Sequence, residues 1–134
     1  MKASAILETV IYGADPQAVA AFYTRLFGLE PVQSVPGRFA FLRCGGQMLL
    51  IFNPDATRDP DHQNGIPAHG ATGPGHLCFR AETAEELEGW RARLAELGIG
   101  IEHEQVWKSG ARSVYLRDPA GNSVEIAEAA IWGL

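Results

Sequence analysis

The sequence has few cysteines and no long apolar run. Its 134 residues contain two cysteines, Cys44 and Cys78, which lie far apart and match neither a CxxC motif nor a metal-finger spacing. No stretch approaches the roughly 18 apolar residues that span a membrane. The first ten residues include one lysine but no apolar core and no small-residue cleavage site, which argues against a signal peptide. Together these absences predict a cytoplasmic protein with reduced thiols.

Basic residues are also scarce. Eleven lysines and arginines against sixteen acidic residues give a net charge of −5, and the basic residues form no cluster. We therefore expect neither nucleic acid nor a membrane as a partner. The rest of the composition, 46% hydrophobic and 20% charged, is typical of a single globular domain. A chain of this length buries enough surface to fold without disulfides.

Signals for strands and helices occur twice in the same order. Each half begins with a strand, continues with a helix that has capping signals at both ends, and finishes with three short strands. The strands are predicted at residues 6–12, 29–33, 39–43, 48–52, 76–80, 99–103, 113–117 and 123–127. The helices begin at Asp15-Pro16 and at the capping box Thr83-Ala84-Glu85-Glu86, and they end at Gly28 and Gly98. Residues 53–74, rich in proline and glycine and without periodicity, are predicted to be a linker and lid.

The two halves can be aligned with each other. Residues 37–43 align with residues 111–117, and in the same register Glu8 corresponds to His76 and Leu50 to Glu125. This repeat predicts an α+β domain of two βαβββ units, at about residues 5–53 and 75–128, related by a pseudo-twofold axis. Equivalent positions of the outer strands are expected to converge on one cavity.

Glu8, His76 and Glu125 are polar residues within apolar strands. A buried carboxylate costs several kcal/mol unless it is ion-paired or metal-bound. Taken singly, each residue has an ordinary alternative: a strand carboxylate often faces solvent, and a lone histidine is usually a packing residue. Taken together, two carboxylates and one imidazole suit a divalent ion such as Fe, Mn, Zn, Ni or Mg better than copper. We therefore predict a metal site at these three residues.

Several motifs resemble the vicinal oxygen chelate superfamily, which includes glyoxalases, bleomycin resistance proteins and extradiol dioxygenases. The motifs are Leu7-Glu8-Thr9-Val10, Phe22-Tyr23, Leu26-Phe27-Gly28-Leu29, Pro74-Gly75-His76-Leu77, and Asp118-Pro119-Ala120-Gly121-Asn122 followed by Glu125. The resemblance covers nearly the whole chain. It implies a glyoxalase-like fold with a mixed sheet curved around a cavity, and a homodimer.

The resemblance places metal ligands at Glu8, Leu50, His76 and Glu125. Leu50 cannot coordinate a metal, which argues against a glyoxalase I site, and the family more often has histidine at the position of Glu8. The resemblance implies a divalent-metal-dependent lyase, isomerase or dioxygenase that acts on a small substrate with neighbouring oxygens. The alternative is a metal-free protein that sequesters a drug or metabolite, as the bleomycin-binding branch does.

Other residues are secondary candidates. His69 and His62, in the 53–74 segment, are candidate acids or bases, and His69 joins Glu125 as a predicted catalytic residue. The alternative for both histidines is a solvated loop position. The predicted substrate-binding residues are Arg38, Arg112, Trp107 and Tyr115, with surface ion pairs as the alternative for the arginines and a core position for Tyr115. Cys78 is interpreted as a small buried thiol.

Overall fold

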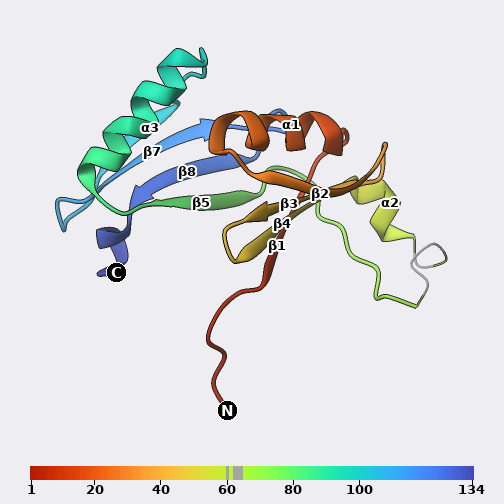
Figure 1. Ribbon diagram of the computed structural model, residues 1–134. Coiled ribbons are helices and arrows are strands. Elements are labelled where there is room, and N and C mark those ends of the chain that lie inside the picture. The colour runs from red at the N-terminus through yellow and green to blue at the C-terminus, as the bar shows by residue number, and fades with distance from the viewer. Residues whose placement is uncertain (60, 62–64) are drawn as a thin grey trace. The chain divides into compact units, whose positions relative to one another are not determined.

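The computed structural model describes residues 1–59, 61 and 65–134, and His62 lies outside these residues (Figure 1). The chain divides into two compact units, Met1–Pro74 and Gly75–Leu134. Unit 1 contains β1 (Glu8–Tyr12), α1 (Pro16–Phe27), β2 (Glu30–Val35), β3 (Phe39–Cys44), β4 (Gln47–Phe52) and α2 (Pro54–Arg58). Unit 2 contains β5 (His76–Ala81), α3 (Ala84–Glu96), β6 (His103–Val106), β7 (Arg112–Arg117), β8 (Ser123–Glu128) and a final 3₁₀ turn (Ala129–Trp132).

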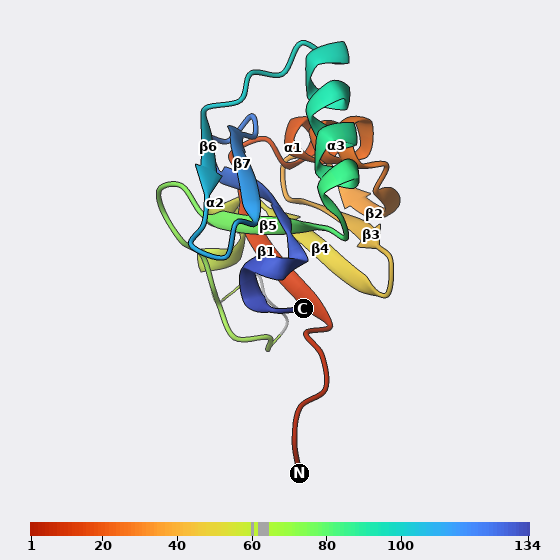
Figure 2. The same cartoon turned by 90° about the vertical axis from the view of Figure 1, so that its left-hand side faces the viewer.

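Each unit is a four-stranded mixed sheet with a helix on one face. The strand orders are β1-β4-β3-β2 and β5-β8-β7-β6. In both sheets the first pair, β1 with β4 and β5 with β8, is parallel, and the remaining pairs are antiparallel. α1 packs on the first sheet and α3 on the second, as Figure 1 and Figure 2 show for each unit. The predicted α+β class and two βαβββ units are confirmed.

The helix ends follow the local sequence signals. The Asp15 side chain accepts a hydrogen bond from the Ala18 amide at the start of α1, and Gly28 ends this helix with a φ of 69°. Such a positive φ favours glycine because it has no Cβ. At the start of α3, Thr83 Oγ1 accepts from the Glu86 amide at 3.2 Å. The Glu86 carboxylate reaches back to the Glu82 amide, one residue before the cap.

The 53–74 segment contains a short helix that was not predicted, α2, with Asn53 as its N-cap and Pro54 at its first position. The role of this segment as a linker and lid stays a prediction. One strand prediction is wrong, because the sixth strand covers His103–Val106 rather than residues 99–103. Gly98 still ends α3 with a positive φ, and the chain reaches the β7 edge only where the Glu102 amide donates to the Tyr115 carbonyl.

The strand pairing confirms the internal repeat. Leu50 pairs with Val10, two residues beyond Glu8 on β1. Glu125 pairs with Cys78, two residues beyond His76 on β5. Glu8 therefore occupies the same place in unit 1 as His76 in unit 2, and Leu50 the same place as Glu125. The pseudo-twofold arrangement of the units and the shared cavity stay predictions.

Helices long and apolar enough to cross a membrane are absent from the described part of the chain.

Candidate functional site

The polar candidates of unit 2 lie on one face of its sheet. Side chains alternate along a strand, so β8 directs Ser123 and Glu125 to one face and Val124 and Ile126 to the other. Val124 and Ile126 are fully buried, on the face that α3 covers. The register places two β5 residues and one β7 residue beside Glu125 on the polar face: His76, Cys78 and Tyr115.

Glu125 is the centre of this polar face. Its side chain is buried, and each carboxylate oxygen has a partner. The Tyr115 hydroxyl donates to Oε1 at 2.9 Å. His76 Nε2 lies 3.3 Å from Oε2. The desolvation cost of the buried carboxylate is thus offset by a hydrogen bond and by an imidazole that pairs with it when protonated.

His76 is oriented by a residue that the sequence analysis missed. Its Nδ1 lies 3.3 Å from Ser123 Oγ, which holds the ring with Nε2 towards Glu125. Ser123 is the direct cross-strand partner of His76 in the parallel β5–β8 pair. Alternation along the strand could have placed Ser123 on the same face as Glu125, two residues later, but its pairing with His76 is known only from the structure.

The motif Asp118-Pro119-Ala120-Gly121-Asn122 joins β7 to β8 and fixes the start of β5. Asp118 Oδ1 accepts hydrogen bonds from the Ala120 and Asn122 amides, and Oδ2 accepts from Asn122 Nδ2. Asn122 Oδ1 in turn accepts from the Gly75 amide at 2.8 Å. Gly75 directly precedes His76, so this buried network sets the position of His76 beside β8.

Tyr115 and Cys78 both hold their protons more tightly than usual. Burial and the hydrogen bond to Glu125 raise the pKa of Tyr115 to about 12. Burial, the negative charge of Glu125 and a hydrogen bond to it raise the pKa of Cys78 to about 12. Both groups are therefore protonated near neutral pH, and the Tyr115 hydroxyl donates to Glu125. Cys78 is exposed as a residue rather than the small buried residue we predicted, although the protein around its thiol desolvates it, and the thiol donates to the Phe79 carbonyl at 3.6 Å.

The raised pKa of Cys78 predicts that its thiol reacts slowly with alkylating reagents. With its pKa raised this far, very little Cys78 is ionised at pH 8, and the thiolate is the species that reacts. In protein treated with EDTA, we expect iodoacetamide to modify Cys78 at least 100-fold more slowly in the folded chain than in urea. Mass spectrometry of the Cys78 peptide measures both rates. Equal rates would contradict the raised pKa of Cys78, whereas Glu125→Gln, which removes a negative charge that raises this pKa, should raise the folded rate.

Glu8 belongs to the other unit. It begins β1 and is exposed, two residues before Val10 on the same face of the first sheet. The structure therefore brings together His76 and Glu125, while the participation of Glu8 stays a prediction. Within the described residues of either unit, no three His, Cys, Asp or Glu side chains are grouped so that they could hold a metal ion. Leu50 is buried between Val10 and Phe41 on neighbouring strands and offers no donor atom.

His69 lies over the first sheet in unit 1. Its Nδ1 is 2.7 Å from the Tyr12 hydroxyl, and its ring makes an edge contact with Phe52. Burial raises the pKa of Tyr12, so this hydroxyl stays protonated at neutral pH. The backbone amide of His69 also donates to the Thr57 carbonyl, which anchors the segment. His69 is thus half-buried and fixed by these contacts, and it is not at the solvated loop position that was the alternative.

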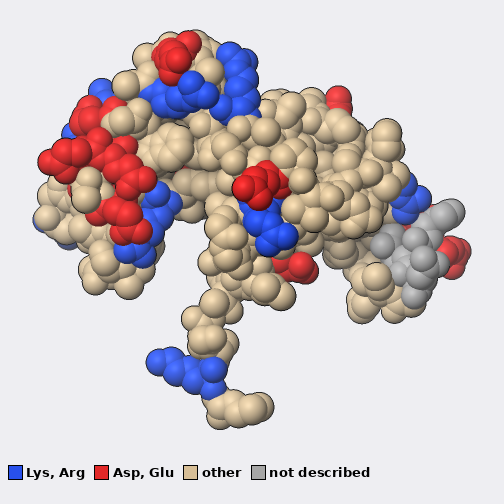
Figure 3. Space-filling view, viewed as in Figure 1, with Lys and Arg blue, Asp and Glu red and all other residues tan. Residues whose placement is uncertain are grey.

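The other predicted substrate-binding residues differ in their surroundings. Arg112 lies on the α3 side of β7 and forms ion pairs with Glu88 and Glu128, which corresponds to the surface alternative. Figure 3 shows acidic and basic side chains interspersed in this region. Trp107 is exposed and donates from Nε1 to Ser113 Oγ at 2.8 Å. Arg38 is exposed in the turn between β2 and β3. Substrate contacts by Arg112, Trp107 and Arg38 stay predictions.

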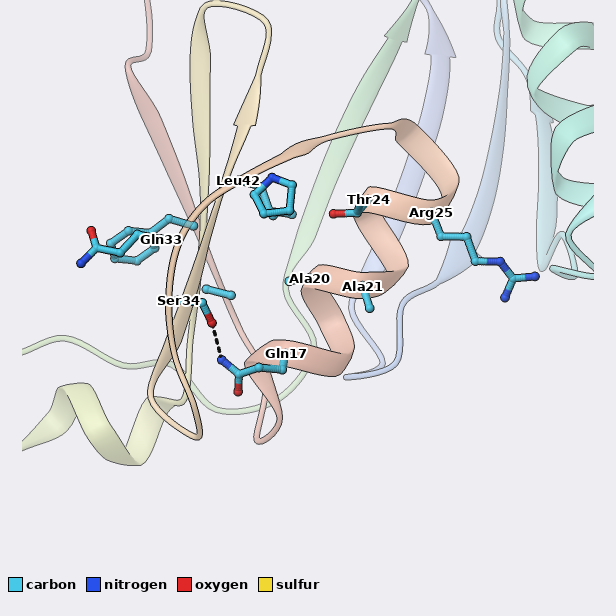
Figure 4. Close-up of a pocket in the computed structure, with 11 residues that line it drawn as sticks. Gln17, Ala20, Ala21, Thr24, Arg25, Gln33, Ser34 and Leu42 are labelled. Carbon is cyan, nitrogen blue, oxygen red and sulfur yellow. Dashed lines mark hydrogen bonds between the residues drawn. The ribbon is translucent and has the colours of Figure 1, made fainter.

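A pocket of about 400 Å³ lies in unit 1 between α1 and the strands β2 and β3 (Figure 4). Small side chains on the helix, including Ala20 and Ala21, leave the space open. Gln17 at its rim donates to Ser34 Oγ and to the Val35 and Phe39 carbonyls, so this amide ties the helix to the sheet. None of the predicted site residues lines this pocket.

A family model and a solved structure both relate this chain to the same family of proteins. Residues 5–126 match the model of the Glyoxalase/Bleomycin resistance protein/Dioxygenase superfamily. The crystal structure of a lactoylglutathione lyase from Agrobacterium tumefaciens is 48% identical, with a TM-score of 0.96 and full coverage of both chains.

Two curated relatives are more distant. A trivalent organoarsenical cleaving enzyme of Bacillus sp. (strain MD1) is 29% identical over 78% of this chain and 60% of that protein. A virulence protein of Salmonella typhimurium is 26% identical over 89% of this chain and 80% of that protein. The matched region thus spans three-fifths of the length of the Bacillus relative.

Proposed function

Because the chain belongs to the glyoxalase/bleomycin resistance protein/dioxygenase superfamily, we propose that it is a divalent-metal-dependent enzyme that acts on a small substrate with neighbouring oxygens. The observation that carries this proposal is the placement of His76 Nε2 3.3 Å from Oε2 of the buried Glu125 carboxylate. The names of the Agrobacterium and Bacillus relatives, a lyase and a cleaving enzyme, support an enzymatic function.

The two paired side chains fit a divalent ion. Metal-bound histidines and carboxylates are usually held by a hydrogen bond at their other polar atom. Here Ser123 lies against His76 Nδ1, and Tyr115 donates to Glu125 Oε1. In the proposal Glu8 supplies the third donor, and the nitrogen–oxygen set suits Fe, Mn, Zn, Ni or Mg. When bound, such an ion would act as a Lewis acid on the oxygens of the substrate.

The chain's own residues then have distinct roles. Glu125 is proposed as both ligand and proton acceptor, and the protonated Tyr115 hydroxyl keeps its carboxylate in place. His69, held by Tyr12, is proposed to give or take a proton at a second point of the substrate. Leu50 leaves the donor set at three, which favours chemistry that needs an open coordination position over a four-ligand glyoxalase I site.

A metal-free binding protein is the second candidate. The apolar surroundings of Leu50, between Val10 and Phe41, favour it because unit 1 offers an apolar surface where family members often have a ligand. The two candidates differ in whether ligand binding survives removal of metal. The homodimer and the cytoplasmic location stay predictions.

Elemental analysis and a chelating probe separate the two candidates. We expect protein purified without chelator to contain about one divalent ion per chain. Acetohydroxamate, which carries two neighbouring oxygens, should bind this protein and lose measurable binding after EDTA treatment, as judged by isothermal titration calorimetry. Protein purified without metal that cannot be loaded, or acetohydroxamate binding that EDTA leaves unchanged, would contradict the enzyme proposal and favour the binding protein.

A further inference from the structure

The sheet face of unit 1 that faces away from α1 is aromatic. Cross-strand pairing places Tyr12 beside Phe52 and Phe52 beside Phe39, in one row across β1, β4 and β3. The next row consists of Val10, Leu50 and Phe41. The four aromatic side chains are half-buried, so part of each remains accessible. The opposite face carries the fully buried residues that pack under α1, such as Ile51 and Leu42.

The rings are close enough to act as one surface. Phe39 and Phe41 are stacked with centroids 4.4 Å apart. Phe41 and Phe52 meet edge to face at 5.3 Å, and Phe52 meets His69 edge to face at 5.0 Å. Aromatic rings prefer these arrangements, and a further flat ring entering the cluster would gain the same contacts.

A polar end lies on the same face. Glu8 precedes Val10 by two residues and Tyr12 by four, and a strand rises about 3.3 Å per residue. Glu8 is thus roughly 7 Å from the Val10 row and roughly 13 Å from the Tyr12 row. These lengths match a small molecule with oxygens near Glu8 and a flat apolar group over Phe41 and Phe52.

The internal repeat shows that this apolar surface is particular to unit 1. Leu50, Phe41 and Val10 occupy the places that Glu125, Tyr115 and Cys78 occupy in unit 2. The same backbone thus carries a hydrogen-bonded polar cluster in one unit and an apolar cluster in the other.

We propose that the Phe39–Phe41–Phe52 surface binds a planar aromatic ring, so that the substrate is an aromatic or similarly flat small molecule with its neighbouring oxygens at one end. This inference rests on the proposed function for the role of the oxygens, but the ring site itself lies within unit 1 and needs no metal. His69 and Tyr12 border the ring site at the end away from Glu8.

The test uses protein treated with EDTA and two alcohols of the same carbon skeleton, flat 2-naphthol and saturated decahydro-2-naphthol. We expect 2-naphthol to bind roughly three- to ten-fold more tightly, because the saturated ring cannot stack. In protein labelled with ¹³C in the phenylalanine rings, the signals of Phe39, Phe41 and Phe52 should shift. Those of Phe22 and Phe27 on α1 should stay in place.

A matched pair of variants completes the test. Phe41→Leu should weaken 2-naphthol binding roughly three- to ten-fold, while Phe22→Leu leaves it unchanged. The NMR result on the unsubstituted protein decides the question even if a variant fails to fold. Equal affinity for the two alcohols, or shifts confined to Phe22 and Phe27, would overturn the proposal. Because no metal is present, such a failure is separate from a failure of the metal site.

Discussion

Replacing Glu125 with alanine is expected to weaken Co²⁺ binding by at least about 100-fold. Loss of a hydrogen-bond partner behind a ligand typically costs 10- to 100-fold in metal affinity, and loss of the ligand itself should cost at least as much. The substitution removes the carboxylate that His76 Nε2 and the Tyr115 hydroxyl both approach. The visible absorption of Co²⁺ titrated into the metal-free protein measures the affinity.

Glu128→Ala is the matched control. Glu128 lies on the same strand but on the opposite face, where it pairs with Arg112 Nε. We expect the Co²⁺ affinity of this variant to stay within about two-fold of the original, since the removed carboxylate lies on the face opposite to Glu125. The Co²⁺ affinity of Tyr115→Phe should lie between the affinities of these two variants, roughly 10- to 100-fold below the original. This substitution removes only the hydrogen bond to Oε1 of Glu125. Equal affinities for Glu125→Ala and Glu128→Ala would remove Glu125 from the metal site.

Asn122→Ala is expected to lower the free energy of unfolding by roughly 2–4 kcal/mol. Asn122 is fully buried, and its side chain joins Asp118 Oδ2 to the Gly75 amide. Truncation leaves a buried acceptor and a backbone donor without this partner, and each such group costs about 1–3 kcal/mol. Urea unfolding followed by circular dichroism measures the change.

The same substitution should also disturb the site, because Gly75 precedes His76. We expect Co²⁺ affinity in Asn122→Ala to fall under conditions where the variant remains folded. Lys108→Ala, in the turn between β6 and β7, is an exposed control that should change stability by less than about 0.5 kcal/mol. A small stability change in Asn122→Ala would show that the buried network is not what anchors the start of β5.

Local signals in the sequence were sufficient for the helices and for the repeat. Asp15, Gly28 and Thr83 act through neighbouring backbone groups, so their roles can be inferred without knowledge of the rest of the fold. The sequence analysis also grouped His76 with Glu125 as candidate ligands. Their contact depends on the parallel pairing of β5 with β8, which only the structure shows.

The features that the sequence did not predict depend on short segments or on partners elsewhere in the chain. The helix α2 was not predicted, because five residues between the cap at Asn53 and Asp59 are too few to show a helical period. The start of the sixth strand depends on where the chain meets the β7 edge, which no residue near 99 determines. Arg112 is placed by Glu88 on α3, a partner 24 residues away that the sequence pattern does not identify.

In the proposed metal site, Glu8, His76 and Glu125 share one divalent ion. The most direct test is a crystal structure of the Zn²⁺-loaded protein with anomalous diffraction measured on both sides of the zinc edge. We expect one anomalous peak about 2.0–2.2 Å from His76 Nε2 and from a carboxylate oxygen of both Glu8 and Glu125. Coordination by the Glu8 carboxylate of the same chain or of a second copy of the chain satisfies this prediction. A peak at other residues, or a zinc ion held by His76 and Glu125 with Glu8 in bulk water, would contradict it.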